Sequence, residues 1–112
     1  MAAEQEPGRI GRYVRMEALP GRGAALTDSL LRIAENMARS PACELYVVNR
    51  SADEADVVWI TEMWTDEAAS TAALGGELGQ VGIEDIVELL AAPPDVIELF
   101  PVGGTGVPKK RG

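Results

Sequence analysis

The chain has 112 residues, of which 46% are hydrophobic and 25% charged, a composition typical of one soluble globular domain. Its formal net charge of −8 opposes binding to phosphate backbones, and no apolar run is long enough to span a membrane, so we expect neither nucleic acid nor membrane as a partner. The N-terminus shows no basic segment leading into an apolar one, which favours a cytoplasmic protein.

The sequence contains no histidine. Histidine is the usual metal ligand, the usual general base at neutral pH and a common haem ligand. Its absence excludes Ser-His-Asp and Cys-His catalytic devices and leaves carboxylates, tyrosine, arginine, asparagine, tryptophan or an organic cofactor for any chemistry. We expect no metal site, and we interpret the single cysteine, Cys43, as a small core residue rather than a reactive thiol.

The first half of the chain predicts a strand followed by a helix, after a flexible segment at residues 1–8. Ile10–Leu19 alternates between apolar and polar residues, which predicts a half-buried strand. Apolar residues then recur at helical spacing through Ala24–Arg39, and Pro41 ends this helix because proline cannot continue the hydrogen-bond ladder. The strand directs Ile10, Val14, Met16 and Ala18 to one face and Tyr13, Arg15 and Glu17 to the other.

The second half predicts a hairpin, two helical pieces and a last strand. Cys43–Arg50 and Asp56–Trp64 are separated by one short polar turn, which predicts antiparallel pairing. Thr65 is the expected N-cap of an alanine-rich helix that ends near Gly75 and Gly76. The remaining expectations are a face shared by Cys43, Leu45, Val47 and Asn49, a helical piece with apolar Val81, Ile86, Leu89 and Leu90, and a strand at Asp95–Val102.

The order β-α-β-β-α-β predicts a ferredoxin-like α+β plait over residues 9–103, with a four-stranded antiparallel sheet, helices on one face and a flexible tail at 104–112. The third strand is apolar on both faces, and helices cover only one of them. The uncovered face should therefore bury itself against a partner, which predicts a homodimer joined sheet to sheet. One face carries Val58, Ile60 and Trp64, and the other carries Val57, Trp59 and Met63.

Three stretches together resemble a known family. VVWITEMWTDEAAS, at residues 57–70, resembles the signature of the antibiotic biosynthesis monooxygenase domain, in which a strand ends in Glu-x-Trp and runs into an acidic, alanine-containing helix. PGRGAALTDSLLRIAENMARSPACELYVV is similar to the family's first helix and second strand, and APPDVIELFPVGGTG is similar to its last strand. The resemblance covers residues 10–106 and implies a dimeric α+β barrel.

Members of this family include monooxygenases of aromatic polyketides and quinols that use dioxygen without metal, haem or flavin. Haem-degrading relatives ligate iron through a histidine on the second helix, so the absence of histidine argues against that activity. Many other members carry a histidine early in the same helix, where this chain reads AASTAALGG. The chain therefore lacks the residue on which such an activity depends.

Two residues at the end of the third strand are the first candidates for catalysis. Trp64 could line a pocket and offer its indole N–H, or it could simply seal the core. Glu62 points the same way, and a buried carboxylate could accept a proton from a substrate. Alternatively, Glu62 forms a structural ion pair with Arg12 or Arg50, or lies at an exposed strand end.

Three further residues are weaker candidates. Asn49 could donate to a substrate oxygen, although asparagine is also common before a turn for local backbone reasons. Tyr13 and Tyr46 could each present a hydroxyl to a substrate or simply occupy a sheet face. Trp59 faces away from Trp64 and is interpreted as an interface or core residue.

The leading hypothesis is a cofactor-independent monooxygenase that oxidises a small aromatic substrate with dioxygen in a pocket between sheet and helices. The alternative is a non-catalytic dimeric module of the same fold that binds a small hydrophobic ligand or a partner. The glycine-rich stretch GGTG follows a strand but opens no helix, so it is not a phosphate loop. It is interpreted as part of a flexible tail that could reach the partner subunit.

Overall fold

The computed structural model describes residues 8–76, 80 and 82–107. Residues 1–7 and 108–112 of the predicted flexible ends, and Val81 of the predicted helical piece, lie outside the described part. The elements are β1 (Ile10–Glu17), α1 (Gly23–Met37), β2 (Cys43–Arg50), β3 (Val57–Trp64), α2 (Glu67–Gly75), α4 (Ile83–Leu89) and β4 (Asp95–Leu99).

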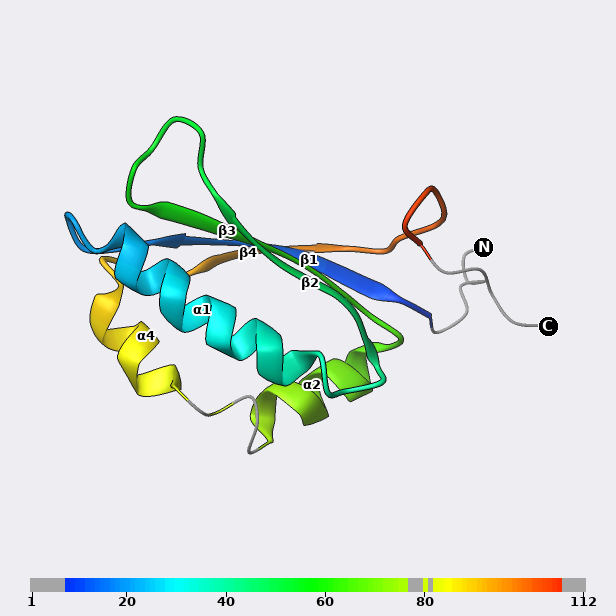
Figure 1. Cartoon of the computed structure of the whole chain (residues 1–112). Helices are drawn as coiled ribbons and strands as arrows, with labels where there is room; N and C mark the ends of the chain where they lie inside the picture. Colours follow the sequence, from blue (N-terminus) through cyan, green and yellow to red (C-terminus); the bar gives the residue numbers. More distant parts are fainter. Residues whose placement is uncertain (1–7, 77–79, 81, 108–112) are drawn as a thin grey trace.

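The four strands form one antiparallel sheet in the order β2-β3-β1-β4. Helices α1, α2 and α4 all lie on the same side of this sheet (Figure 1). The predicted ferredoxin-like α+β fold is therefore confirmed. Among the described residues, no helix is long and apolar enough to cross a membrane.

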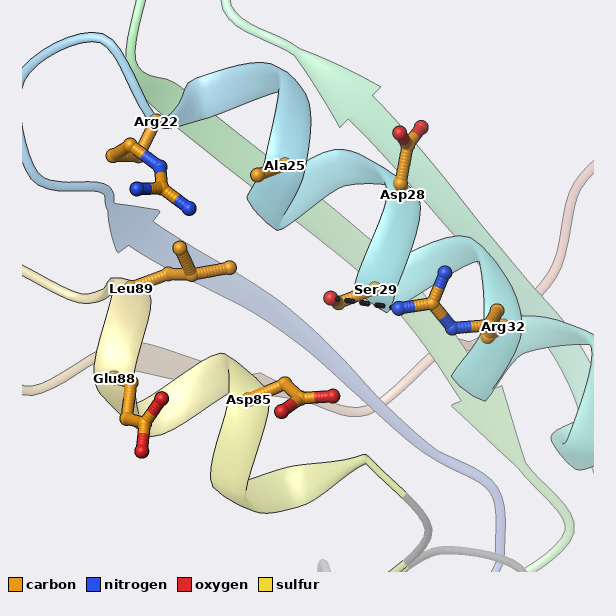
Figure 2. Close-up of a pocket in the computed structure, with 8 residues that line it drawn as sticks. All are labelled: Arg22, Ala25, Asp28, Ser29, Arg32, Asp85, Glu88 and Leu89. Atoms are coloured by element: carbon orange, nitrogen blue, oxygen red, sulfur yellow. Dashed lines mark hydrogen bonds between the residues drawn. The ribbon is translucent and has the colours of Figure 1, made fainter.

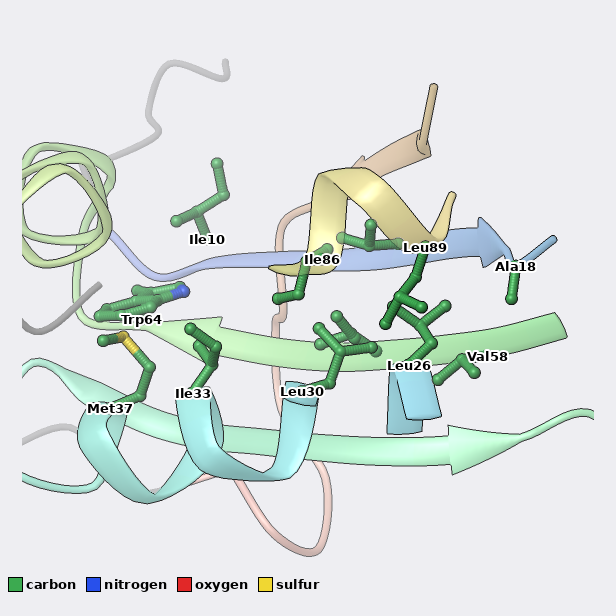
Figure 3. Close-up of a cluster of buried hydrophobic side chains, with 12 residues drawn as sticks. Ile10, Ala18, Leu26, Leu30, Ile33, Met37, Val58, Trp64, Ile86 and Leu89 are labelled. Carbon is green, nitrogen blue, oxygen red and sulfur yellow. The ribbon is translucent and has the colours of Figure 1, made fainter. Parts of the chain in front are cut away.

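The core lies between the sheet and the helices (Figure 3). Even-numbered residues of β1 and β3 point toward the helices, because side chains alternate across a strand and the two strands pair Val14 with Ile60. From α1 the core receives residues at helical spacing, so its apolar stripe is the one that the sequence predicts. The main core side chains are Ile10, Val14, Leu26, Leu30, Ile33, Met37, Val58, Ile60, Trp64, Ile86 and Leu89.

The opposite face of the sheet, called here the open face, is covered by none of the helices of the described residues (Figure 1). The loop between β2 and β3 rises on this side. Odd-numbered residues of β1, β3 and β4 point here, as predicted for β1 and β3. Its side chains include Tyr13, Leu45, Val47, Trp59, Met63, Ile97 and Leu99.

Two details of the predicted local structure are wrong. The N-cap of α2 is Asp66 rather than Thr65, since the Asp66 carboxylate accepts a hydrogen bond of 2.7 Å from the Ala69 backbone N–H. The register of β2 shifts between Cys43 and Leu45, so Cys43 pairs with Trp64 and packs against the core instead of sharing the open face. The interpretation of Cys43 as a core residue is nevertheless confirmed, because it is partly buried there.

The last strand is shorter than predicted and ends at Leu99 rather than Val102. Pro101 lacks the backbone N–H that would continue the ladder with β1. The side chain of Pro101 instead lies against Gly11, where a Cβ atom added to the glycine would approach it to 3.3 Å.

Helix α1 is capped by a residue that lies far away in sequence. Arg22, at the N-cap position, makes no side-chain capping bond. The Asp56 carboxylate accepts hydrogen bonds from the backbone N–H groups of Gly21, at 3.0 Å, and Gly23, at 2.9 Å. A carboxylate is favourable here because it satisfies free N–H groups at the positive end of the helix dipole. These bonds hold the beginning of α1 next to the beginning of β3.

Candidate functional site

A row of polar side chains crosses the helix-facing side of the sheet, with one residue from each strand. The strand registers align Tyr46 of β2 with Glu62 of β3, Glu62 with Arg12 of β1, and Arg12 with Glu98 of β4. We call these four residues the polar row. Because neighbouring positions on paired strands place their side chains close together, the row brings two carboxylates, a guanidinium and a phenol into contact range.

Glu62 is the buried centre of the polar row, with 5% of its surface exposed. Its Oε1 atom accepts a hydrogen bond of 2.7 Å from the Trp64 indole N–H and one of 3.0 Å from Arg12 Nη1. The sequence predicted that an inward carboxylate here needs a partner, and Arg12 is that partner. Arg50, the other arginine considered, donates instead to the backbone carbonyl of Ala55.

Arg12 connects the row to helix α2 and to the sheet edge. Its Nη2 donates to the Ser70 hydroxyl at 3.2 Å, and its Nε lies 3.5 Å from a carboxylate oxygen of Glu98. Ser70 is fully buried, whereas Glu98 is more than half exposed. The guanidinium therefore contacts three oxygen-bearing side chains at once, which a lysine ammonium with its single nitrogen could not reproduce.

Tyr46 ends the row on the β2 side and is partly buried against the core. Burial raises the pKa of its phenol well above the usual value, and the nearby Glu62 charge raises it further. The phenol therefore stays protonated at neutral pH. No residue in the described part of the chain forms a hydrogen bond with its hydroxyl. Among the described residues, Tyr46 is thus a donor whose hydroxyl has no acceptor.

Trp64 is fully buried and clusters with Ile10, Ile33 and Met37 (Figure 3). Its indole N–H is already used by Glu62. In this structure the tryptophan fills the core beside the polar row and presents no free donor.

The remaining two predicted residues lie on the open face, across the sheet from Glu62 and Trp64. The Asn49 amide donates to the Trp59 carbonyl at 3.1 Å and to the Thr61 hydroxyl at 3.1 Å, so it stabilises the hairpin locally. Tyr13 is 45% exposed on the same face. The structure therefore brings together Tyr46, Glu62 and Trp64 and separates them from Asn49 and Tyr13.

A cleft of about 340 Å³ lies elsewhere, between α1 and α4 (Figure 2). Its lining carries both charge signs, and the Ser29 hydroxyl accepts a hydrogen bond of 3.2 Å from Arg32 at its wall. No residue of the polar row lines it. The lining residues are Arg22, Ala25, Asp28, Ser29, Arg32, Asp85, Glu88 and Leu89.

Two members of the site were not predicted from the sequence. Ser70 lies in an alanine-rich stretch that gives no sign of a buried hydroxyl, and Glu98 belongs to a short strand whose register could not be assigned from its pattern. The signal that could have pointed to Glu98 is that several predicted strands each carry a charged residue. Within the described residues, no group of three or more cysteine, aspartate or glutamate side chains is arranged to hold a metal ion.

Comparison with known proteins agrees with this architecture. Residues 9–80 match the sequence profile of the antibiotic biosynthesis monooxygenase family. A crystal structure from Chloroflexus aurantiacus, named as a candidate antibiotic biosynthesis monooxygenase, is 33% identical and has a TM-score of 0.79, with 89% of this chain and 99% of that chain covered. No protein of curated function matches the sequence significantly.

More distant structures share the fold alone. A candidate monooxygenase of the same name from Caulobacter crescentus has a TM-score of 0.80 at 22% identity, covering 87% of this chain and 92% of that chain. Another from Nitrosomonas europaea has a TM-score of 0.79 at 15% identity, covering 88% and 98%.

Proposed function

The chain belongs to the antibiotic biosynthesis monooxygenase family, and on that premise we propose that it is a cytoplasmic monooxygenase that oxidises a small aromatic substrate with dioxygen and without a cofactor. The observation that supports this proposal is the polar row, in which a buried carboxylate and a protonated phenol lie on neighbouring strands. A phenol or hydroquinone substrate needs one group that takes its proton and one that stabilises its oxygen.

The reaction balances with dioxygen as the only co-substrate. When an electron-rich ring carries an activated methylene group, loss of one proton gives an anion that passes an electron to dioxygen. The resulting radicals combine into a peroxide anion, which takes back the proton from the base, loses water and leaves a carbonyl. One oxygen atom enters the product and the other leaves as water, so the four-electron oxidation of the carbon matches the four-electron reduction of dioxygen.

The residues of the row have complementary roles in this proposal. Glu62 accepts the substrate proton, while Arg12 and the Trp64 N–H fix the position of its Oε1 atom. Tyr46 donates its hydroxyl to the substrate oxygen, because it is the donor of the row that lacks an internal acceptor. A substrate approaching the row meets Tyr46 first, since this side chain is partly buried whereas Trp64 is fully buried.

The test is dioxygen uptake by metal-stripped protein with a panel of hydroquinones and anthrones. We expect uptake above the uncatalysed rate, and a loss of about 100-fold or more in Glu62→Gln, in line with the usual contribution of a general base. Tyr46→Phe should also lower the rate, whereas Tyr13→Phe, which changes the tyrosine of the open face, should not. Equal rates in Tyr46→Phe and Tyr13→Phe would contradict the assigned site.

A second candidate function is a non-catalytic module that binds a small hydrophobic ligand. The observation that favours it is the indole of Trp64, which is fully buried and already hydrogen-bonded, so it offers no free donor to a reacting substrate. The same panel separates the two functions: a ligand that quenches tryptophan fluorescence saturably, with no dioxygen uptake, supports binding without turnover.

We further propose that the protein is a homodimer joined through the open face. That face presents exposed apolar side chains from β1, β2 and β4, an arrangement that a soluble monomer would leave in contact with water. Light scattering should give twice the mass of the chain, and Ile97→Arg should give a monomer. Val87→Arg, on the outer side of α4 where the side chain is 62% exposed, is the matched control and should leave the dimer intact.

A further inference from the structure

Helix α2 has one fully buried side chain, and it is polar. Ser70 is 0% exposed, while the other residues of Glu67–Gly75 are exposed or partly buried. A helix that packs on a sheet normally buries an apolar side chain at its deepest point, because burying a hydroxyl is costly unless it is hydrogen-bonded. The position of Ser70 therefore needs a specific explanation.

The Ser70 hydroxyl acts both as a hydrogen-bond donor and as a hydrogen-bond acceptor. It donates to the Glu67 carbonyl at 2.9 Å and accepts from Arg12 Nη2 at 3.2 Å. Arg12 Nη1 in turn donates to Glu62 at 3.0 Å, and Glu62 accepts from Trp64 at 2.7 Å. A continuous chain of hydrogen bonds therefore runs from the first turn of α2 to the carboxylate at the centre of the polar row.

The first turn of α2 is itself fixed in place. Asp66 caps it through the Ala69 N–H at 2.7 Å, and this end of the helix follows directly from the strand that carries Glu62. Ser70 thus presents its oxygen to Arg12 from a rigid position. Without that oxygen, Arg12 would keep two carboxylate partners, and the exposed Glu98 would compete with Glu62 for the guanidinium.

We propose that Ser70 is a positioning residue: by holding Arg12 Nη2, it directs Arg12 Nη1 at Glu62 and so fixes the orientation of the proposed proton acceptor. This inference rests on the proposed oxygenase function for its catalytic consequence. The coupling between Ser70 and Glu62 can be measured independently of any activity.

The first measurement is the indole N–H region of the nitrogen–proton NMR spectrum, which contains signals from the two tryptophans of the chain. Trp59→Phe identifies the signal of Trp64. In Ser70→Ala we expect the chemical shift of the Trp64 indole proton to change, because Trp64 Nε1 and Arg12 Nη1 donate to the same Glu62 oxygen and a displacement of Arg12 alters that hydrogen bond. Ser29→Ala is the matched control, since Ser29 is also a buried helical serine that accepts from an arginine, at 3.2 Å.

The second measurement is dioxygen uptake with the same variants. Ser70→Ala should lower kcat about threefold to tenfold with little change in KM, the scale expected from one lost hydrogen bond. Ser29→Ala should change neither constant. Circular dichroism of both variants should match that of the wild type.

The third measurement uses Arg12→Lys, which keeps the charge beside Glu62 but cannot span both acceptors. It should shift the Trp64 signal as Ser70→Ala does, and the double variant should show no further shift, because both changes break the same chain of hydrogen bonds.

The outcomes separate the two proposals. An unmoved Trp64 signal in a folded Ser70→Ala protein overturns the positioning role, whatever the activity. An equal loss of rate in Ser70→Ala and Ser29→Ala overturns it as well. If the Trp64 signal moves but the wild-type protein consumes no dioxygen with any substrate of the panel, the coupling stands and the proposed oxygenase function fails.

Discussion

Replacing Arg12 should be among the most destabilising single substitutions in this protein. Arg12 and Glu62 form an ion pair of 3.0 Å, with 13% and 5% of their side chains exposed. Arg12→Met keeps most of the side-chain volume but leaves the Glu62 carboxylate buried without its cation. Breaking a buried pair in this way typically costs about 3–5 kcal/mol, a large share of the stability of a domain of this size.

Removing the unpaired charge of Glu62 should partly rescue the stability that Arg12→Met loses. Glu62→Gln removes the charge but keeps a side-chain oxygen that can accept from Trp64. The double variant Arg12→Met/Glu62→Gln should therefore be more stable than Arg12→Met alone, by about 1–3 kcal/mol, since no charge remains buried and unpaired.

The assay is urea unfolding followed by tryptophan fluorescence at one fixed protein concentration, because the apparent stability of the proposed dimer would depend on concentration. Arg39→Met, at an exposed position just after α1, is the control and should change the free energy of unfolding by no more than about 0.5 kcal/mol. If Arg12→Met lowers the free energy of unfolding no more than Arg39→Met does, the buried pair does not stabilise the fold in this way. The same holds if adding Glu62→Gln to Arg12→Met lowers it further.

Three further predictions concern Gly23, Asp56 and Tyr46. Gly23→Ala should lower the free energy of unfolding by about 1–3 kcal/mol in urea titrations, because its Cβ would lie 2.7 Å from the Ala55 carbonyl oxygen. Gly75→Ala is the control: its Cβ would meet no neighbouring atom within 4 Å, so the free energy of unfolding should not change measurably. The backbone N–H groups that donate to Asp56 lower its pKa, so its contribution to stability is complete above the ordinary aspartate pKa and is lost as the pH falls through the lowered value. Asp56→Asn should therefore flatten the acid side of a plot of stability against pH, and an unchanged slope would contradict the cap. Burial raises the pKa of Tyr46, so the folded state disfavours its ionised form and stability should fall as the pH rises above the ordinary tyrosine pKa. In an ultraviolet titration, Tyr46→Phe should remove only the absorbance change that occurs late and accompanies unfolding.

The fold was predictable from the sequence because its signals are local and periodic. Alternation in β1 places Val14 inward and Tyr13 outward, and the apolar spacing in α1 brings Leu30 and Ile33 to the core. The end of β4 was not predicted, because the expected strand ran through Pro101, which has no backbone N–H for the ladder and lies against Gly11. Patterns of this kind still predict the correct fold when the element boundaries are wrong by a few residues.

The candidate site was predictable only in part, because its geometry depends on register. An inward carboxylate at Glu62 predicts that a cation must lie nearby, and Arg12 was one of two arginines considered. The choice between them follows from the pairing of β1 with β3, which the sequence pattern does not specify. The same limit applies to Asn49: its alternation with Leu45 and Val47 is correct, but its pairing with Trp59 places it on the open face, and the bulge turns only Cys43 toward the core.

The cost of the polar row is itself an argument that the row has a purpose beyond stability. A buried ion pair rarely stabilises a protein more than well-packed apolar residues of the same volume would. Glu62 and Arg12 nevertheless occupy positions on the helix-facing side of the sheet, next to core residues that could have continued there as Ile60 and Val14 do. A chain selected only to fold would gain from apolar residues at both positions. The double variant Arg12→Met/Glu62→Gln isolates this point, since it should remain folded while losing the dioxygen uptake proposed for the wild-type protein.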